Sequence, residues 1–251
     1  MGTLIFYSLI GGLFSLIGGF VLLWKREITQ ALTTPLLSFA AGAFLGAALL
    51  DILPEALEIA TDPQLVLIWM LGGFILYFVL ERLLMTYVYK HPNAQNSHSD
   101  HTETLPILLI LGDTLHNFLD GIVIALAYVV NPAVGLVTTL AVAAHEIPQE
   151  IGDFSVLLHQ GWAKKVIIAV NVLQSLTTLP GAVLGFYVGH LFTPYLPYIL
   201  AFTAGIFIYI SASDIIPEIH HKAGHKSFYR VVIPLVLAVV IVGYLTRLAH
   251  A

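Results

Sequence analysis

The sequence predicts an all-α, polytopic membrane protein, and both its composition and the length of its apolar segments support this prediction. Of the 251 residues, 58% are hydrophobic and 10% are charged, and the mean hydropathy is +0.91. A soluble domain carries about 25% charged residues. The composition therefore excludes a soluble enzyme, a disordered chain and a nucleic-acid-binding protein. The net charge is −5 and there is no cysteine, so the chain offers neither a disulfide nor a thiolate metal ligand.

Eight apolar segments are long enough to cross a bilayer, which requires roughly 20 residues of helix. Polar residues or prolines separate them, and they lack the alternating pattern of barrel strands. Because lipid cannot satisfy irregular backbone, each segment is predicted to be a helix. Together they form a single transmembrane domain over residues 1–251, with spans near 4–24, 35–56, 65–87, 105–130, 133–157, 166–191, 195–216 and 231–248.

The basic residues mark one side of the predicted bundle. Of the ten Lys and Arg residues, all except Arg247 lie in or beside the first, third, fifth and seventh connections. The positive-inside rule then places these odd-numbered loops in the cytoplasm and both termini outside, in a plasma or inner cell membrane. The third loop, 88–104, contains three histidines that could hold a metal transiently, although an ordinary polar linker explains it equally well.

Two spans repeat one pattern in opposite orientations. Residues 41–55 contain Ala-Gly-x-Phe and then Asp-Ile-x-Pro-Glu, and residues 204–218 contain the same pattern at an offset of 163. The second span runs outward and the seventh runs inward, which is the arrangement of an inverted-repeat transporter. We expect a 3+2+3 bundle in which spans one to three mirror six to eight. Chance similarity between apolar helices is the alternative.

Spans four and five carry acids that have no basic residue near them in the sequence. Ionisable groups inside a bilayer are costly and normally face a cavity or a partner. These acids must be protonated, hydrated near a membrane surface, or neutralised by a bound cation. From residue 91 to residue 162 there is no Lys or Arg, whereas spans four and five contain Asp113, Asp120, Glu146, Glu150 and Asp153.

Helical spacing favours the bound cation. His116 and Asp120 lie four residues apart and share a helix face, and His145 and Gln149 repeat this spacing. At about 1.5 Å per residue, both pairs reach the middle of a ~30 Å core. Pro148 frees a backbone carbonyl, as the broken helices of transporters do. Imidazole, carboxylate and amide ligands suit Zn²⁺, Fe²⁺ or Mn²⁺, so we expect a transport site here; a permanent structural metal is the alternative.

The motif HNFLDG at 116–121, followed by HEIPQE at 145–150, resembles the paired motifs of the ZIP (Zrt/Irt-like) divalent metal transporters. Residues 51–55 and 214–218 are similar to that family's second and seventh helices, and the resemblance covers essentially the whole chain. It implies a transporter that moves Zn²⁺, or iron, manganese or cadmium, into the cytoplasm, often as a homodimer in the lipid bilayer. The metal site that it implies has principal ligands His116, Asp120, His145 and Gln149, with Asn117 and Glu146 facing an adjoining second site.

Two features depart from the family's pattern. Many relatives carry histidine where this chain has Gln149, and an amide binds transition metals more weakly than imidazole. Some relatives supply a glutamate from span six, where this chain has no acid and Gln174 is the nearest candidate. We therefore expect a site that binds two metal ions less than a site that binds one. Further acids that could line the pathway are Asp51, Asp214, Glu150 and Asp153, although Asp51 and Asp214 could instead cap backbone beside a proline.

An intramembrane zinc metalloprotease is the main alternative function. Such enzymes use H-E-x-x-H, with two histidines one helical turn apart. Here His145 and Glu146 are followed by Gln149, so the second histidine is missing, and Pro148 distorts the turn between them. A proton channel would leave the paired His/Asp and His/Gln faces unexplained. The sequence therefore predicts alternating-access metal transport and no enzymatic activity.

Overall fold

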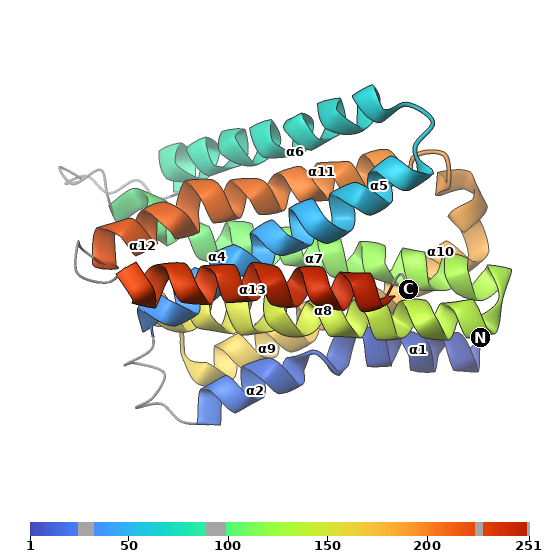
Figure 1. Cartoon of the computed structure of the whole chain (residues 1–251), viewed down its shortest axis with the longest axis horizontal. Coiled ribbons are helices and arrows are strands. Elements are labelled where there is room, and N and C mark those ends of the chain that lie inside the picture. Colours follow the sequence, from blue (N-terminus) through green and yellow to red (C-terminus); the bar gives the residue numbers. More distant parts are fainter. Residues whose placement is uncertain (25–32, 89–98, 224–227, 250–251) are drawn as a thin grey trace.

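The computed structural model is an elongated bundle of helices that lie side by side (Figure 1). It describes residues 1–24, 33–88, 99–223 and 228–249, and every regular element in these residues is helical. The all-α prediction is confirmed for this part of the chain. Seven helices are long and apolar enough to cross a membrane, namely Gly2–Leu23, Thr34–Ile59, Pro63–Thr86, Thr104–Val130, Lys164–Phe192, Leu196–His221 and Phe228–Leu248.

The remaining predicted span corresponds to α8 (Pro132–His159). This helix is 28 residues long, but it is not among the seven candidate spans. The count of eight spans therefore stays a prediction. Asn131 explains where α8 begins, since its side chain accepts a hydrogen bond from the Ala133 amide at 2.8 Å and Pro132 occupies the first turn.

Five of the predicted spans consist of consecutive helical segments. The first and the sixth each contain two segments, α1 (Gly2–Leu13) with α2 (Leu16–Trp24) and α9 (Lys164–Ser175) with α10 (Thr178–Phe192). The second and the seventh each contain three, α4 (Thr33–Gly46), η1 (Ala47–Ile52) and α5 (Leu53–Ile59), and α11 (Leu196–Tyr209), η3 (Ile210–Ile215) and α12 (Ile216–Ala223).

The other helices are α6 (Pro63–Leu83), which continues into η2 (Leu84–Val88), α7 (Ser99–Val130) and α13 (Phe228–Ala249). Because α7 begins at Ser99, the end of the predicted loop 88–104 is helical. His91 and His98 of that loop lie outside the described residues, and so do Lys25, Arg26, Lys90 and Lys226. The side chains of His101 and Lys222 are also outside the described part of the chain.

The segments η1 and η3 are π-helical and lie at matching places in the second and seventh spans. They begin at residues 47 and 210 and end at residues 52 and 215, so their offset of 163 is the offset of the sequence repeat. Each contains one acid of the repeat, Asp51 or Asp214, and both acids are buried. π-Helical turns inside α-helices are frequent at functional sites. The repeated sequence therefore coincides with a repeated backbone irregularity.

The helices pack as two groups. The site half contains α1, α2 and α7 to α10, and the outer half contains α4 to α6, α11 to α13 and the three π-helical segments. Helix α8 also packs on α4 and α13 and so joins the two halves. Of the apolar 18-residue stretch within α7, 61% is buried inside the bundle. Only 17% of the corresponding stretch is buried in α6, and the same share is buried in α13. Helix α7 is therefore interior, and α6 and α13 lie at the periphery.

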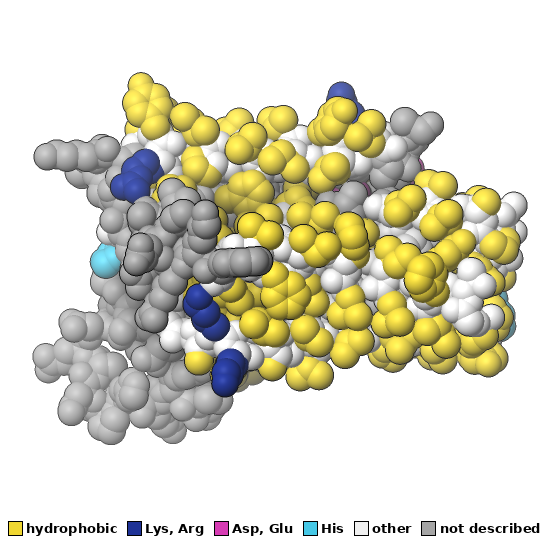
Figure 2. Space-filling view, turned by 90° about the horizontal axis from the view of Figure 1, so that it is seen from below, with side chains coloured by type: hydrophobic (Ala, Val, Ile, Leu, Met, Phe, Trp, Pro, Cys, Tyr) yellow, Lys and Arg dark blue, Asp and Glu magenta, His cyan; other side chains and the backbone are white. Residues whose placement is uncertain are grey.

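The outside of the bundle is suited to lipid. Figure 2 shows hydrophobic side chains over most of the visible face, with most of the Lys and Arg side chains toward one end. Arg82, Lys164 and Arg230 belong to this basic end, because α6 ends there and α9 and α13 begin there (Figure 1). Both termini lie toward the opposite end (Figure 1). The chain is thus built as a multi-pass membrane protein.

Glycines permit the closest helix contacts within the outer half. A Cβ atom built on Gly73 of α6 would lie 2.0 Å from the Phe202 carbonyl oxygen of α11, and one on Gly205 would lie 1.9 Å from the Met70 carbonyl oxygen. No side chain fits at such distances. The contact between α6 and α11 therefore requires glycine at these two positions, as small residues generally allow close packing of membrane helices.

We predict that Gly73→Ala destabilises the protein by about 1–3 kcal/mol, because the added methyl group forces α6 and α11 apart. Gly72→Ala is the matched control, since its Cβ atom would lie 3.9 Å from the nearest atom, Phe202 Cδ2. That change should be neutral or stabilising, because alanine favours helix over glycine. Thermal unfolding of the detergent-solubilised variants measures both effects, and equal midpoints would contradict the prediction.

Candidate metal centre

Three buried side chains from α7 and α8 converge in the site half. His116 Nε2 lies 3.6 Å from Asp120 Oδ2 on the same helix and 3.2 Å from Glu146 Oε1 on α8. One ligand atom from each residue lies within 4.8 Å of the others. These atoms are close enough to share one metal ion. Among the described residues, this is the one group of three or more His, Asp or Glu side chains with that geometry.

Gln149 completes the group from the next turn of α8. Its Nε2 atom lies 3.3 Å from His116 Nε2, so the imidazole accepts this hydrogen bond when its proton is on Nδ1. The lone pair that accepts the hydrogen bond is the one that would bind a metal. Gln149 Oε1 has no hydrogen-bond partner among the described residues. Rotation of the amide would therefore present an oxygen ligand beside a metal-binding imidazole nitrogen.

The other predicted ligands are placed differently. His145 lies in α8 directly before Glu146, but its side chain lies outside the described residues, so its role stays a prediction. The Asn117 amide nitrogen donates to the backbone oxygen and to Oδ2 of Asp113, at 3.2 and 3.1 Å. Its amide oxygen lies 3.4 Å from Thr178 Oγ1. Asn117 thus contacts a network beside the His116–Asp120–Glu146 group.

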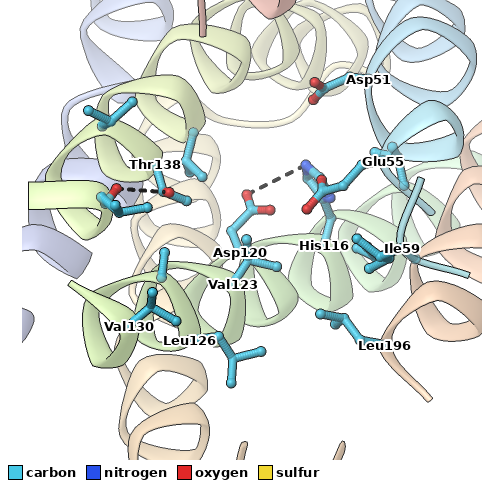
Figure 3. A pocket seen from close by; sticks show the side chains of 16 residues that line it. Asp51, Glu55, Ile59, His116, Asp120, Val123, Leu126, Val130, Thr138 and Leu196 are labelled. Atoms are coloured by element: carbon cyan, nitrogen blue, oxygen red, sulfur yellow. Dashed lines mark hydrogen bonds and ion pairs between the residues drawn. The ribbon is translucent and has the colours of Figure 1, made fainter. Parts of the chain in front are cut away.

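A cavity of about 400 Å³ leads to His116 and Asp120 (Figure 3). Ile59, Val130 and Leu196 also line it, and these residues lie near the ends of α5 and α7 and the start of α11. Those helix ends belong to the end of the bundle toward which both termini lie (Figure 1). The cavity therefore connects the centre with the end opposite the basic residues.

The four predicted pathway acids lie in two places. Asp51 lines the cavity, and Glu55, one turn further along the chain, lines it as well (Figure 3). Asp214, Glu150 and Asp153 are buried and are not among the residues that line it. Glu150 and Asp153 follow the centre on α8, toward the basic end. Glu150 Oε1 accepts a hydrogen bond from Ser175 Oγ at 3.0 Å.

Sequence reasoning did not assign Glu55 or Asp113 to the site. Glu55 lies four residues after Asp51, and Asp113 lies four residues before Asn117, so helical spacing could have indicated both. The contact between Gln174 and Asp113 had no such signal, because α7 and α9 are distant in the sequence. Gln174 Nε2 donates to Asp113 Oδ2 at 2.8 Å.

The fold and the site together define a class of protein. It is a multi-pass helical membrane protein with a buried group of side chains, at the end of a cavity, that could hold a metal ion. A family model described as "ZIP Zinc transporter" matches residues 1–107 and 101–246. The chain therefore belongs to the ZIP zinc transporter family, as the paired motifs predicted.

Curated relatives carry matching names. The chain is 40% identical over 119 residues to "Zinc transporter ZIP6" of Homo sapiens, across 47% of this chain and 16% of that protein. It is 41% identical over 114 residues to "Zinc transporter ZIP10" of Danio rerio, across 45% of this chain and 14% of the relative. It is 26% identical over 255 residues to "Zinc transporter ZIP4" of Homo sapiens, across 76% of this chain and 39% of that relative. The chain thus spans well under half the length of each of these relatives.

We predict that Gln149→His tightens Zn²⁺ binding about tenfold, or by ~1.4 kcal/mol, because imidazole is a stronger ligand for zinc than an amide. Competition titration of the purified protein with a zinc chelator measures the affinity. Gln160→His, at the C-terminal end of the same helix, is the control and should leave the affinity unchanged. Equal affinities in both variants would show that Gln149 does not contact the metal.

Proposed function

We propose that this chain transports a divalent transition metal, zinc foremost, into the cytoplasm by alternating access through the centre between α7 and α8. The observation that carries this proposal is the position of the His116–Asp120–Glu146 group. The three side chains are buried inside the bundle, yet His116 and Asp120 line a cavity that leads to one end of it. A closed structural metal site needs no such access, whereas a transport site must load its ion from one side.

The ligand set of the proposed site is His116, Asp120, His145 and Gln149, with Glu146 and Asn117 adjoining. Glu146 lies closer to His116 than Asp120 does, at 3.2 against 3.6 Å, so we assign Glu146 to the same ion. Iron, manganese and cadmium are further candidate substrates, since imidazole and oxygen ligands also suit other divalent ions. Membership of the ZIP family supports zinc.

Charge and access together support the proposed direction of transport. The positive-inside rule assigns the basic end of the bundle to the cytoplasm and the opposite end, with both termini, to the outside. The cavity leads to the end opposite the basic residues. A metal ion would thus enter from outside along Asp51 and leave toward the cytoplasm past Glu150, Asp153 and Asp214.

The repeated elements support an alternating-access mechanism with a 3+2+3 inverted repeat. The π-helical segments share the 163-residue offset, and the packing of α11 on α6 has its counterpart in the packing of α4 on α13. A glycine lies at the closest approach in both helix pairs. A Cβ atom on Gly42 of α4 would lie 2.2 Å from the Leu235 carbonyl oxygen of α13, just as one on Gly205 of α11 would meet the Met70 carbonyl oxygen of α6. Gly42 is the counterpart of Gly205 at this offset. Two equivalent units could exchange roles between an outward-open and an inward-open state.

At the basic end, two hydrogen bonds between side chains join the two halves. His159 Nε2 of α8 lies 3.1 Å from Glu218 Oε1 of α12, and Thr104 Oγ1 of α7 donates to Glu81 Oε1 of α6 at 3.3 Å. Glu218 is the counterpart of Glu55 in the repeat. We infer that Glu55 lines the pathway in the outward-open state. In that state Glu218 is held by His159 and closes the cytoplasmic end.

The site assignment predicts the loss of metal uptake. In proteoliposomes supplied with Zn²⁺, Cd²⁺, Fe²⁺ or Mn²⁺, His116→Ala and His145→Ala should each lower the uptake rate about tenfold or more, because each removes an imidazole ligand. His190→Ala removes an exposed histidine of α10 and should have no effect. Undiminished uptake in the first two variants would refute the site, and peptide cleavage without uptake would favour the metalloprotease.

The closing role of Glu218 predicts greater accessibility at the cytoplasmic end. Because the chain contains no cysteine, a single Asp153→Cys substitution gives one reactive thiol. Adding Glu218→Ala should speed its labelling by a membrane-impermeant reagent from the cytoplasmic side by about tenfold, since losing ~1.4 kcal/mol from the closed state shifts the equilibrium by that factor. Glu58→Ala, which removes an exposed acid of α5, is the control. Equal labelling rates in both backgrounds would show that Glu218 does not close the pathway.

A further inference from the structure

A second polar network lies beside the metal centre, on the side of α9 and α10. Its members are Asp113 and Asn117 of α7, Gln174 of α9 and Thr178 of α10, none of them more than 2% exposed. Close packing of α7 on α10 brings the network together, since a Cβ atom on Gly121 would lie 2.0 Å from the Thr178 carbonyl oxygen. Asn117 directly follows the ligand His116, so the network adjoins the centre.

Hydrogen-bond acceptors set the orientation of both amides. The Gln174 Nε2 atom lies 2.8 Å from Asp113 Oδ2 and 3.4 Å from the backbone oxygen of Ile110. The Asn117 Nδ2 atom lies 3.1 Å from the same Asp113 Oδ2 and 3.2 Å from the backbone oxygen of Asp113. Backbone oxygens only accept hydrogen bonds, so the NH₂ group of each amide must point to Asp113.

Two N–H donors therefore converge on one buried carboxylate oxygen. A buried carboxylate is costly unless positive charge or hydrogen-bond donors compensate it. Hydrogen bonds from N–H groups to an ionised carboxylate are among the strong ones. They supply to Asp113 the partial positive charge that a bound cation would otherwise supply.

We propose that this network takes the place of a second metal ion, so that the centre binds a single ion, and that Gln174 is the residue that sets this number. The inference rests on the proposed function, because it presupposes a metal ion at His116 and Asp120. Gln174 presents an N–H donor to Asp113, and a donor repels a cation. The amide of Asn117 donates to the same carboxylate oxygen, so its nitrogen and not its oxygen faces Asp113.

A single substitution would reverse this arrangement. Gln174→Glu keeps the shape of the side chain but places a carboxylate oxygen 2.8 Å from Asp113 Oδ2, where the amide nitrogen now lies. Gln174 Oε1 has no hydrogen-bond partner among the described residues, so both oxygens of the new carboxylate would be available. Two facing carboxylates and an Asn117 amide free to rotate form an oxygen ligand set that suits Mn²⁺ or Zn²⁺.

The experiment counts metal ions per chain. The purified 251-residue chain is dialysed to equilibrium against Zn²⁺ or Mn²⁺, and the bound metal is measured by mass spectrometry. The wild type is compared with the double variant His116→Ala and Asp120→Ala, so that ions bound by histidines elsewhere cancel in the difference. We expect this difference to be one ion. Gln174→Glu should bind one ion more than the wild type, and Gln160→Glu, the same change at the end of α8, should bind no more than the wild type.

Two results would overturn the inference. One is a loss of two ions between the wild type and the double variant. The other is a folded Gln174→Glu protein, monodisperse in gel filtration, that binds no additional ion. Should Gln174→Glu not fold, Asp113→Asn decides instead: it should bind as many ions as the wild type, and the loss of one ion on removing that carboxylate would overturn the inference. A difference of zero between the wild type and the double variant would instead refute the proposed function, since the centre would then bind no metal at all.

Discussion

The burial of several acids in a stretch of sequence that contains no Lys or Arg is the constraint on which this structure depends. Asp120 and Glu146 flank His116 inside the bundle, and no Lys or Arg occurs between residues 91 and 162. Such a group is stable in a membrane only beside a cation, a donor or water. The chain meets this need in two ways, with a metal-binding geometry and a cavity at His116, and with amide donors at Asp113. The ligand geometry at His116 and the cavity that leads to it can therefore both be understood as ways of compensating buried negative charge.

The packing of the helices makes that burial possible. Glycines bring α7 against α10 and α6 against α11 closely enough for backbone to touch backbone, and the two halves each form a compact unit around these contacts. The site lies in one half, while Asp51 and Glu55 reach it from the other. In the proposed mechanism, a pathway between the two halves opens at either end while each half keeps its own packing. The hydrogen bond between His159 and Glu218 joins them at the end away from the cavity.

Local rules were sufficient for much of the fold and for part of the site. Hydrophobic length predicted the helices, and i, i+4 spacing predicted that His116 and Asp120 act together, because both patterns depend on a single helix. The 163-residue offset predicted a relation between two spans, and their π-helical segments share that offset. Glu55 and Asp113 were not assigned to the site, although their four-residue spacing from Asp51 and Asn117 could have indicated both. The contact between Gln174 and Asp113 could not be predicted in this way, because it joins helices that are distant in the sequence.

The sequence by itself determined the all-α class, the polarity of α7 and α8, the absence of Lys and Arg from residues 91–162 and the family, because each is a property of residue order within one segment. Tertiary structure alone decided that Glu146 lies closer to His116 than Asp120 does, that Gln174 donates to Asp113, and that the cavity leads to one end of the bundle. The physical reason is that these contacts join helices that are distant in sequence. Their distances depend on how the helices cross, and crossing is set by the close packing of the whole bundle.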